Sequence, residues 1–185
     1  MLTKIAGAGT FALLTGLAAQ ISVPTPPDGI PTTLQTLVVV LAAAGLGAKW
    51  GTASMLIYIA AGILGAPLFA ERSVGLAVIL GQTGGYIVGF VLCQPVVHWL
   101  VRDGAGKVRA WPFALLAGIA AHAIIFAIGV PWLWFTHCVL DGISDFTPLR
   151  AIQGGLFPFI PGTIIKSALA AAIIWYFRPV LNRDR

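Results

Sequence analysis

Long apolar runs separated by short polar segments dominate this sequence. Each run is nearly free of charge and approaches the roughly 20 residues that a membrane-spanning helix needs. The dividing segments SVPTPPDGIPTT, LGAKWG, LGAP and RDGAGKVRAWP are rich in proline, glycine or charge, as turns and loops are. We therefore predict six helices, at about residues 4–23, 33–48, 50–66, 76–101, 111–138 and 161–178.

The composition of the chain indicates that these helices span a membrane. Hydrophobic residues make up 58% of the 185 residues, charged residues make up 9%, and the mean hydropathy is +0.94. A soluble domain of this size would lack polar cover with so few charges. We predict an all-α integral membrane protein, a six-transmembrane-helix bundle that forms one membrane domain over 1–185. The first run is too long for a signal peptide and continues into prolines, so we interpret it as the first span.

Basic residues predict the orientation. Six spans place both termini, the loop at Lys49 and the loop from Arg102 to Arg109 on one side of the membrane. That side collects most of the basic residues, namely Lys4, Lys49, Arg102, Lys107, Arg109, Arg178, Arg183 and Arg185. The opposite side holds Asp28, Glu71, Arg72, Asp141, Asp145 and Arg150. Basic loops stay in the cytoplasm, so both termini are predicted to be cytoplasmic, in a multi-pass protein of the cell membrane.

Lys166 is the charge that falls inside an apolar run, in PFIPGTIIKSALAAAIIWYF. A lysine at membrane depth costs about 2.5–3.5 kcal/mol unless it faces the interior and meets a partner. One interpretation is a buried site for an anionic group. The other is a lysine that reaches the headgroups from a helix start near Pro158 and Pro161. We favour the buried site.

Other polar residues gather in three stretches. Thr33, Gln35 and Thr36 stand at the start of the second predicted helix, where threonines can also serve as caps. A glutamine amide inside the bilayer needs partners, so Gln35 is a candidate site residue. Thr163 lies three residues before Lys166 and shares its helix face. The third stretch is GQTGGY, which contains Gln82, Thr83, Gly84, Gly85 and Tyr86; close helix packing is the alternative explanation for its glycines.

Two further patterns concern partners and chemistry. Ala8, Ala12 and Gly16 repeat every fourth residue, a stripe that permits close contact within the bundle or with a separate membrane subunit; we predict the second. His137 and Asp141 are four residues apart, as a proton relay would require, whereas His122 is interpreted as a satisfied polar contact.

Several function classes are excluded or disfavoured. The basic residues form no stripe that would bind nucleic acid. Cys93 and Cys138 have no metal-binding or redox spacing, so no cofactor or metal is predicted. The chain has no phosphate-binding loop, so active transport would need energy from a partner or an ion.

The ordered motifs ALLTGLAAQISVPTPP, IPTTLQTLVVVLAA, LIYIAAGILGAPLFA, GQTGGYIVGF and PFIPGTIIK resemble the BioY family, the biotin-specific substrate-binding subunits of energy-coupling-factor transporters. The resemblance implies a non-enzymatic six-helix bundle that captures biotin from the outer face. It implies a partner transmembrane subunit and two ATPase subunits, or a small homo-oligomer in a solitary member.

The resemblance also assigns the candidate residues. Lys166 would meet the carboxylate or the ureido carbonyl of biotin. The implied polar partners are Gln35, Gln82, Thr33, Thr83 and Tyr86, beside Gly84 and Gly85, and Phe69 would form an apolar wall. The family usually has aspartate where this chain has Thr163, which removes a counter-ion from Lys166. The alternatives are a subunit for another small vitamin, an intramembrane enzyme that uses His137 and Asp141, and a carrier or channel that acts alone.

Overall fold

The computed structural model describes residues 1–23 and 30–182. Asp28, Arg183 and Arg185, which entered the charge count above, lie outside the described residues. The longest helices are α1 (Leu2–Ala19), α2 (Gln35–Leu46), α3 (Ala48–Ile63), α5 (Gly84–Val101), α6 (Trp111–Phe135) and α8 (Ile160–Tyr176). The shorter elements are β1 (Ser22–Val23), β2 (Thr32–Thr33), η1 (Ala70–Arg72), α4 (Leu76–Leu80), the π-helical turn η2 (Thr136–Leu140), α7 (Pro148–Gly155), η3 (Phe157–Phe159) and α9 (Arg178–Leu181).

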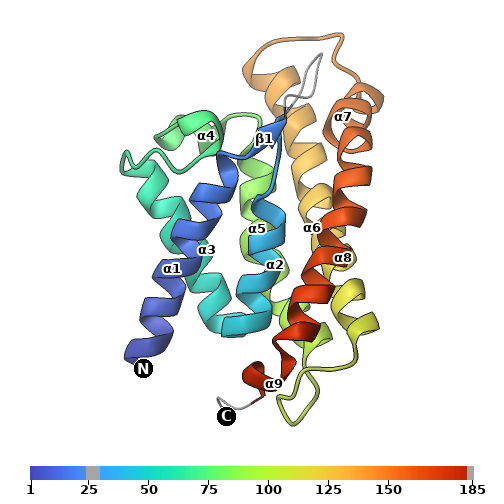
Figure 1. Cartoon of the computed structure of the whole chain (residues 1–185). Coiled ribbons are helices and arrows are strands. Elements are labelled where there is room, and N and C mark those ends of the chain that lie inside the picture. Colours follow the sequence, from blue (N-terminus) through green and yellow to red (C-terminus); the bar gives the residue numbers. More distant parts are fainter. Residues whose placement is uncertain (24–29, 183–185) are drawn as a thin grey trace.

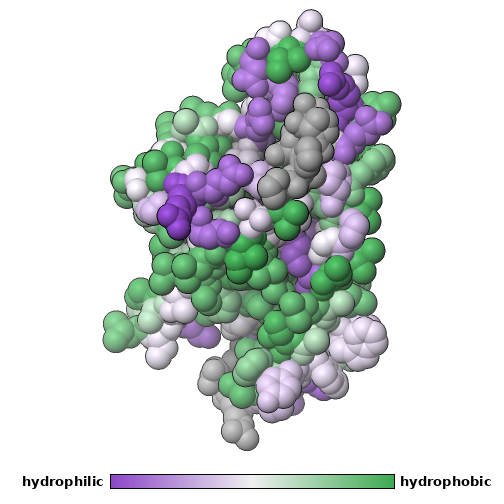
Figure 2. Space-filling view, turned by 45° about the horizontal axis from the view of Figure 1, so that its top comes forward, coloured by the Kyte–Doolittle hydropathy of each residue, from purple (hydrophilic) through white to green (hydrophobic). Residues whose placement is uncertain are grey.

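Within the described part of the chain, four helical stretches are long and apolar enough to cross a membrane. They are Leu2–Ala19, Gly84–Val101, Trp111–Leu140 and Pro148–Tyr176, and Gln35–Leu46 is a shorter apolar helix. Figure 2 shows hydrophobic residues covering the flank of the bundle, while hydrophilic residues gather mainly at one end. This distribution fits a protein whose flank faces lipid.

The helices pack into one bundle around a continuous apolar core. Helix α5 packs along α6, α6 packs against α8, and α1 packs against α2 and α3 (Figure 1). Glycines on α5 allow this close approach, because a Cβ atom at Gly89 would collide with the backbone of Ile125 on α6.

The two ends of the bundle differ. Both termini, the α2–α3 junction and the α5–α6 connection lie at one end, and β1, α4 and α7 lie at the other (Figure 1). Arg102 holds the first end together, because its guanidinium donates hydrogen bonds to the carbonyl oxygens of Ala44 (2.9 Å), Gly106 (2.8 Å) and Leu181 (3.4 Å).

The opposite end, which we call the irregular end, departs from regular helix. The first helix is shorter than the range 4–23 that was predicted: α1 ends at Ala19, and Ser22 and Val23 pair antiparallel with Thr33 and Thr32. In η1, Glu71 and Arg72 have φ angles of 57° and 59°, a left-handed backbone that is uncommon outside glycine.

The single helix expected over 76–101 is wrong, because the structure has two helices there. Gly75 precedes α4 with a φ of 90°, and Gly81 follows it in an extended conformation. Trp132 of α6 donates its indole N–H to the Gly81 carbonyl oxygen at 2.9 Å, which gives a carbonyl group at the break a partner. Helix α5 begins only at Gly84.

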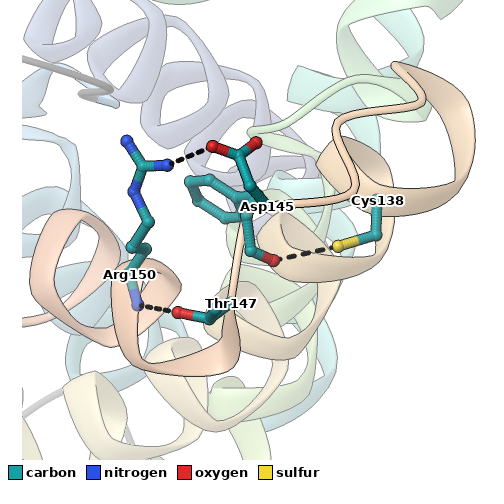
Figure 3. A network of polar contacts seen from close by, with 5 residues as sticks. Cys138, Asp145, Thr147 and Arg150 are labelled. Carbon is teal, nitrogen blue, oxygen red and sulfur yellow. Dashed lines mark hydrogen bonds and ion pairs between the residues drawn. The ribbon is translucent and has the colours of Figure 1, made fainter.

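The connection between α6 and α7 is held by its own side chains (Figure 3). Cys138 donates to the carbonyl oxygen of Phe146 (3.0 Å), and Asp145 pairs with Arg150 (3.3 Å). Thr147 caps α7 by accepting the backbone N–H of Arg150. The His137 ring stacks on Phe146, with ring centroids 4.0 Å apart.

The small-residue stripe on α1 is internal. Ala8 and Ala12 are 0% and 3% exposed, and Gly16 is covered by the side chain of Leu68. Helix α1 therefore uses this stripe to approach α2 and α3, its own neighbours. The prediction that Ala8, Ala12 and Gly16 contact a partner subunit is wrong for this reason.

Candidate functional site

A cavity lies inside the bundle near the irregular end. It is bounded by residues of α2, α3, α5, α6 and α8, by the η1 segment and by η3. Its apolar walls are Ile30, Phe69, Val78, Ile87, Phe90, Ile125, Phe126 and Phe159. Its polar lining consists of Thr33, Gln35, Thr36, Tyr58, Glu71, Ser73, Thr83, Tyr86, His122 and Lys166. An apolar cavity with a few convergent polar groups is the usual form of a small-molecule site.

Lys166 lines this cavity and is 7% exposed. Its ammonium group donates one hydrogen bond, to the Thr33 carbonyl oxygen at 3.0 Å. An ammonium carries three donors, so two have no partner among the described residues. No carboxylate in the described part of the chain pairs with it. The snorkelling interpretation therefore does not describe this side chain, which is a buried cation without a counter-ion among the described residues.

A chain of hydrogen bonds connects Lys166 to α3. The Thr33 hydroxyl donates to Gln35 Oε1 at 2.9 Å, and Gln35 Nε2 donates to the Tyr58 hydroxyl at 2.7 Å. Gln35 is 6% exposed and Tyr58 is 1% exposed, so the amide has found the partners that its depth requires. The sequence pointed to Gln35, but Tyr58 was missed, because a tyrosine in an apolar helix gives no sign of its tertiary partner.

His122 and Thr36 form a second polar contact on the cavity wall. His122 Nε2 lies 2.9 Å from Thr36 Oγ1, and Nδ1 lies 2.8 Å from the Gly118 carbonyl oxygen. His122 is thus the satisfied polar contact that the sequence suggested, and it also faces the cavity.

Aromatic rings shape the rest of the wall. Phe69 is 0% exposed and packs edge-on against Tyr58, with ring centroids 5.4 Å apart. Gln20, at the end of α1, fixes this segment by donating to the Phe69 carbonyl oxygen and accepting the Arg72 backbone N–H. Phe69 therefore lies where an apolar wall was expected.

Tyr86 contributes its ring to the cavity wall, because its hydroxyl is bonded elsewhere. The hydroxyl donates to the Gly155 carbonyl oxygen at 2.9 Å and so joins α5 to α7. The ring stacks with Phe159, with centroids 6.3 Å apart. Thr83 also lines the cavity, but its hydroxyl donates to the Val78 carbonyl oxygen at 3.2 Å.

Four predicted site residues do not line this cavity. A Cβ atom at Gly84 or Gly85 would collide with Ile79 or Trp132, so these glycines serve close packing, which was the alternative explanation. Gln82 is exposed and lines a separate hollow that shares Ser73, Val78 and Thr83 with the cavity. Thr163 contributes a buried Oγ1 that has no hydrogen-bond partner within residues 1–23 and 30–182.

The side chains of this site are suited to binding a ligand. Among the described residues, no three histidine, cysteine, aspartate or glutamate side chains lie close enough to hold a metal ion. His137 is bonded to the Leu133 carbonyl oxygen, and no hydrogen bond among the described residues joins it to Asp141. The hydrogen bonds that the relay hypothesis requires are therefore not formed.

Comparison with a solved structure gives the class of fold first. The chain has the fold of the S-component for biotin from an ECF-type ABC transporter, with a TM-score of 0.80 over 96% of this chain and 92% of that one, at 22% sequence identity. A family model then matches residues 1–183, and the chain belongs to the BioY family, which confirms the resemblance seen in its motifs.

Relatives found by sequence comparison agree with this family assignment. The chain is 40% identical over 163 residues to the probable biotin transporter BioY of Pyrococcus horikoshii, covering 88% of each chain. It is 37% identical over 166 residues to the biotin transporter BioY of Thermotoga maritima, covering 90% of each. The relatives are transporters, and this chain is a membrane protein of their family.

Proposed function

We propose that this chain is a substrate-binding subunit that captures biotin in the cavity beside Lys166. The names of its relatives support biotin as the ligand. The observation that carries the proposal is the buried ammonium of Lys166. It donates one of its three hydrogens to the Thr33 carbonyl oxygen and has no counter-ion among the described residues. A buried cation in this state is stabilised by a ligand oxygen.

Biotin matches the lining of the cavity. Its thioether ring and aliphatic chain are apolar, as are Phe69, Phe90 and Phe126. Its carboxylate and ureido carbonyl are acceptors for Lys166, and its ureido N–H groups need acceptors in turn. The site residues that we propose on this basis are Lys166, Gln35, Thr33, Thr36, Tyr58 and Phe69.

The proposed topology has six spans, formed by α1, α2, α3, α5, α6 and α8. The end with both termini carries most of the basic residues of the chain, and such loops remain cytoplasmic. The cavity then lies toward the outer face of the cell membrane, where biotin arrives. A cysteine introduced at Lys107 should react with an impermeant thiol reagent only after lysis, and one introduced at Asp145 should react in intact cells.

Uptake against a gradient requires energy from elsewhere. The chain has no phosphate-binding loop, and we propose a partner transmembrane subunit and two ATPase subunits as its source. A solitary homo-oligomer is the alternative. Co-purification of ATPase subunits with the tagged chain from its native membrane distinguishes the two.

A subunit for a different vitamin is the second candidate, and the specific observation in its favour is Thr163. Equilibrium binding to the detergent-purified protein tests both candidates. Biotin should bind saturably, and desthiobiotin should displace it, whereas thiamin should not. Absence of saturable biotin binding, or displacement by thiamin, would overturn the proposal.

A further inference from the structure

The backbone near His122 determines which group donates in the hydrogen bond between Thr36 and His122. The Gly118 carbonyl oxygen can only accept a hydrogen bond, and it lies 2.8 Å from His122 Nδ1. The ring proton must therefore be on Nδ1. Ser167 Oγ, 3.5 Å from the same nitrogen, can accept a share of that proton and does not alter the assignment.

The ring is neutral in this position. His122 is 1% exposed, and no hydrogen bond joins it to a carboxylate within residues 1–23 and 30–182. A second proton would leave a charge buried without compensation. With Nδ1 protonated, Nε2 is an acceptor, so the Thr36 hydroxyl donates its hydrogen to Nε2 across 2.9 Å.

Thr36 therefore presents an acceptor to the cavity. Its hydroxyl hydrogen is committed to His122, and Thr36 lines the cavity, so the oxygen lone pairs are what its hydroxyl has left to offer a ligand. Such a group pairs with a ligand N–H and repels a ligand oxygen that carries no hydrogen. We infer that Thr36 is a specificity-determining residue that accepts an N–H of the ligand, with His122 as the positioning residue that fixes the direction of its hydroxyl.

This inference rests on the proposed function for the identity of the ligand. In biotin, the N–H groups belong to the ureido ring, whereas the carboxylate offers only acceptors. The ureido ring should accordingly lie against Thr36. Thr33, whose carbonyl oxygen accepts a hydrogen bond from Lys166, lies three residues before Thr36, in β2. A urea presents N–H and C=O side by side. Its N–H could therefore donate to Thr36 while its C=O accepts from Lys166.

The test compares biotin with its two lactam analogues, in each of which CH2 replaces one ureido N–H. Wild type should bind one of the two lactams about tenfold more weakly than biotin. Thr36→Val keeps the volume and removes the acceptor, so it should weaken biotin about tenfold and lose the preference for biotin over that lactam. Thr36→Ser should retain the preference. Thr15→Val is the matched control, because Thr15 is a buried threonine that donates to the Phe11 carbonyl oxygen outside the cavity.

Variants of His122 test the positioning role. His122→Leu frees the Thr36 hydroxyl to rotate, so the preference for biotin over the same lactam should fall severalfold. His122→Gln should restore part of it, because the amide oxygen can accept the hydroxyl. A merely structural role would change the affinity for all three ligands by the same factor and leave the ratio unchanged.

The outcomes separate this inference from the proposed function. Wild type that does not bind biotin would overturn the proposed function. Biotin binding with identical ligand ratios in wild type and Thr36→Val would overturn the inference alone. The ratio is measured on the folded, monodisperse fraction of each variant, and Thr36→Ala provides a second deletion of the acceptor if Thr36→Val does not fold.

Discussion

Lys166 and Arg102 are both buried basic residues, but their surroundings differ. Arg102 is 4% exposed and donates to three backbone carbonyl oxygens from different parts of the chain. Lys166 is 7% exposed, donates to one carbonyl oxygen and faces a cavity. Burial alone therefore does not mark a binding site. What separates the two is the number of carbonyl oxygens that the protein supplies, three for Arg102 and one for Lys166, and the cavity that only Lys166 lines.

The same difference extends to the two ends of the bundle. Arg102 closes the end with both termini, where the connections are bonded to one another. Lys166 lies in the cavity near the irregular end, where Gly81 lies at the break between α4 and α5 and the backbone at Glu71 is left-handed. Irregular backbone around a cavity is tolerated at membrane depth, whereas lipid-facing segments must satisfy their own hydrogen bonds.

The largest expected effect is on stability at the closed end. Arg102→Met removes the donors of three carbonyl groups and should lower the free energy of unfolding by about 3–5 kcal/mol. Thermal unfolding of the ligand-free protein in detergent measures this change. Arg150→Met is the control, because the Arg150–Asp145 pair is exposed and contributes about 1 kcal/mol or less. Equal shifts in the two variants would contradict the structural role of Arg102.

A smaller effect is expected when Lys166 receives a counter-ion. Thr163→Asp places a carboxylate one helical turn from Lys166, at a position whose Oγ1 has no partner in the described part of the chain. The ligand-free protein should become more stable by about 1 kcal/mol, and biotin binding should tighten or stay unchanged. Loss of binding would contradict this expectation. If only the variant bound biotin, the assignment of biotin to this chain would fail.

The smallest effect on stability is expected from removing the cation itself. Lys166→Met loses one hydrogen bond but also removes an uncompensated buried charge, so the free energy of unfolding should change by about 1 kcal/mol or less. Lys107→Met, at an exposed position, provides the baseline. A loss of stability as large as that of Arg102→Met would show that the two cations have the same role.

Much of the fold follows from the sequence, because an apolar run in a bilayer must satisfy its backbone as a helix. Apart from α5, the long helices lie within a few residues of the runs that predicted them. The break before Gly84 was missed, because glycine is also common in closely packed membrane helices, and nothing local shows that Trp132 bonds to Gly81.

The site was only partly predictable for a similar reason. Lys166 and Gln35 are conspicuous because they are polar residues in apolar surroundings. Arg102 was interpreted as a topology signal, since its burial depends on carbonyl groups far away in the sequence. The stripe of Ala8, Ala12 and Gly16 predicted close contact, but a stripe does not identify its partner, which the structure shows to be the chain itself.

The most direct test of the role of Lys166 is an equilibrium titration of biotin against wild type, Lys166→Ala and Lys107→Ala. Lys166→Ala should bind biotin more weakly by about 1.5–3 kcal/mol, roughly 10- to 150-fold, because a charge-assisted hydrogen bond is lost. Lys107→Ala should bind as wild type does. Unchanged affinity in a stably folded Lys166→Ala variant would contradict the account.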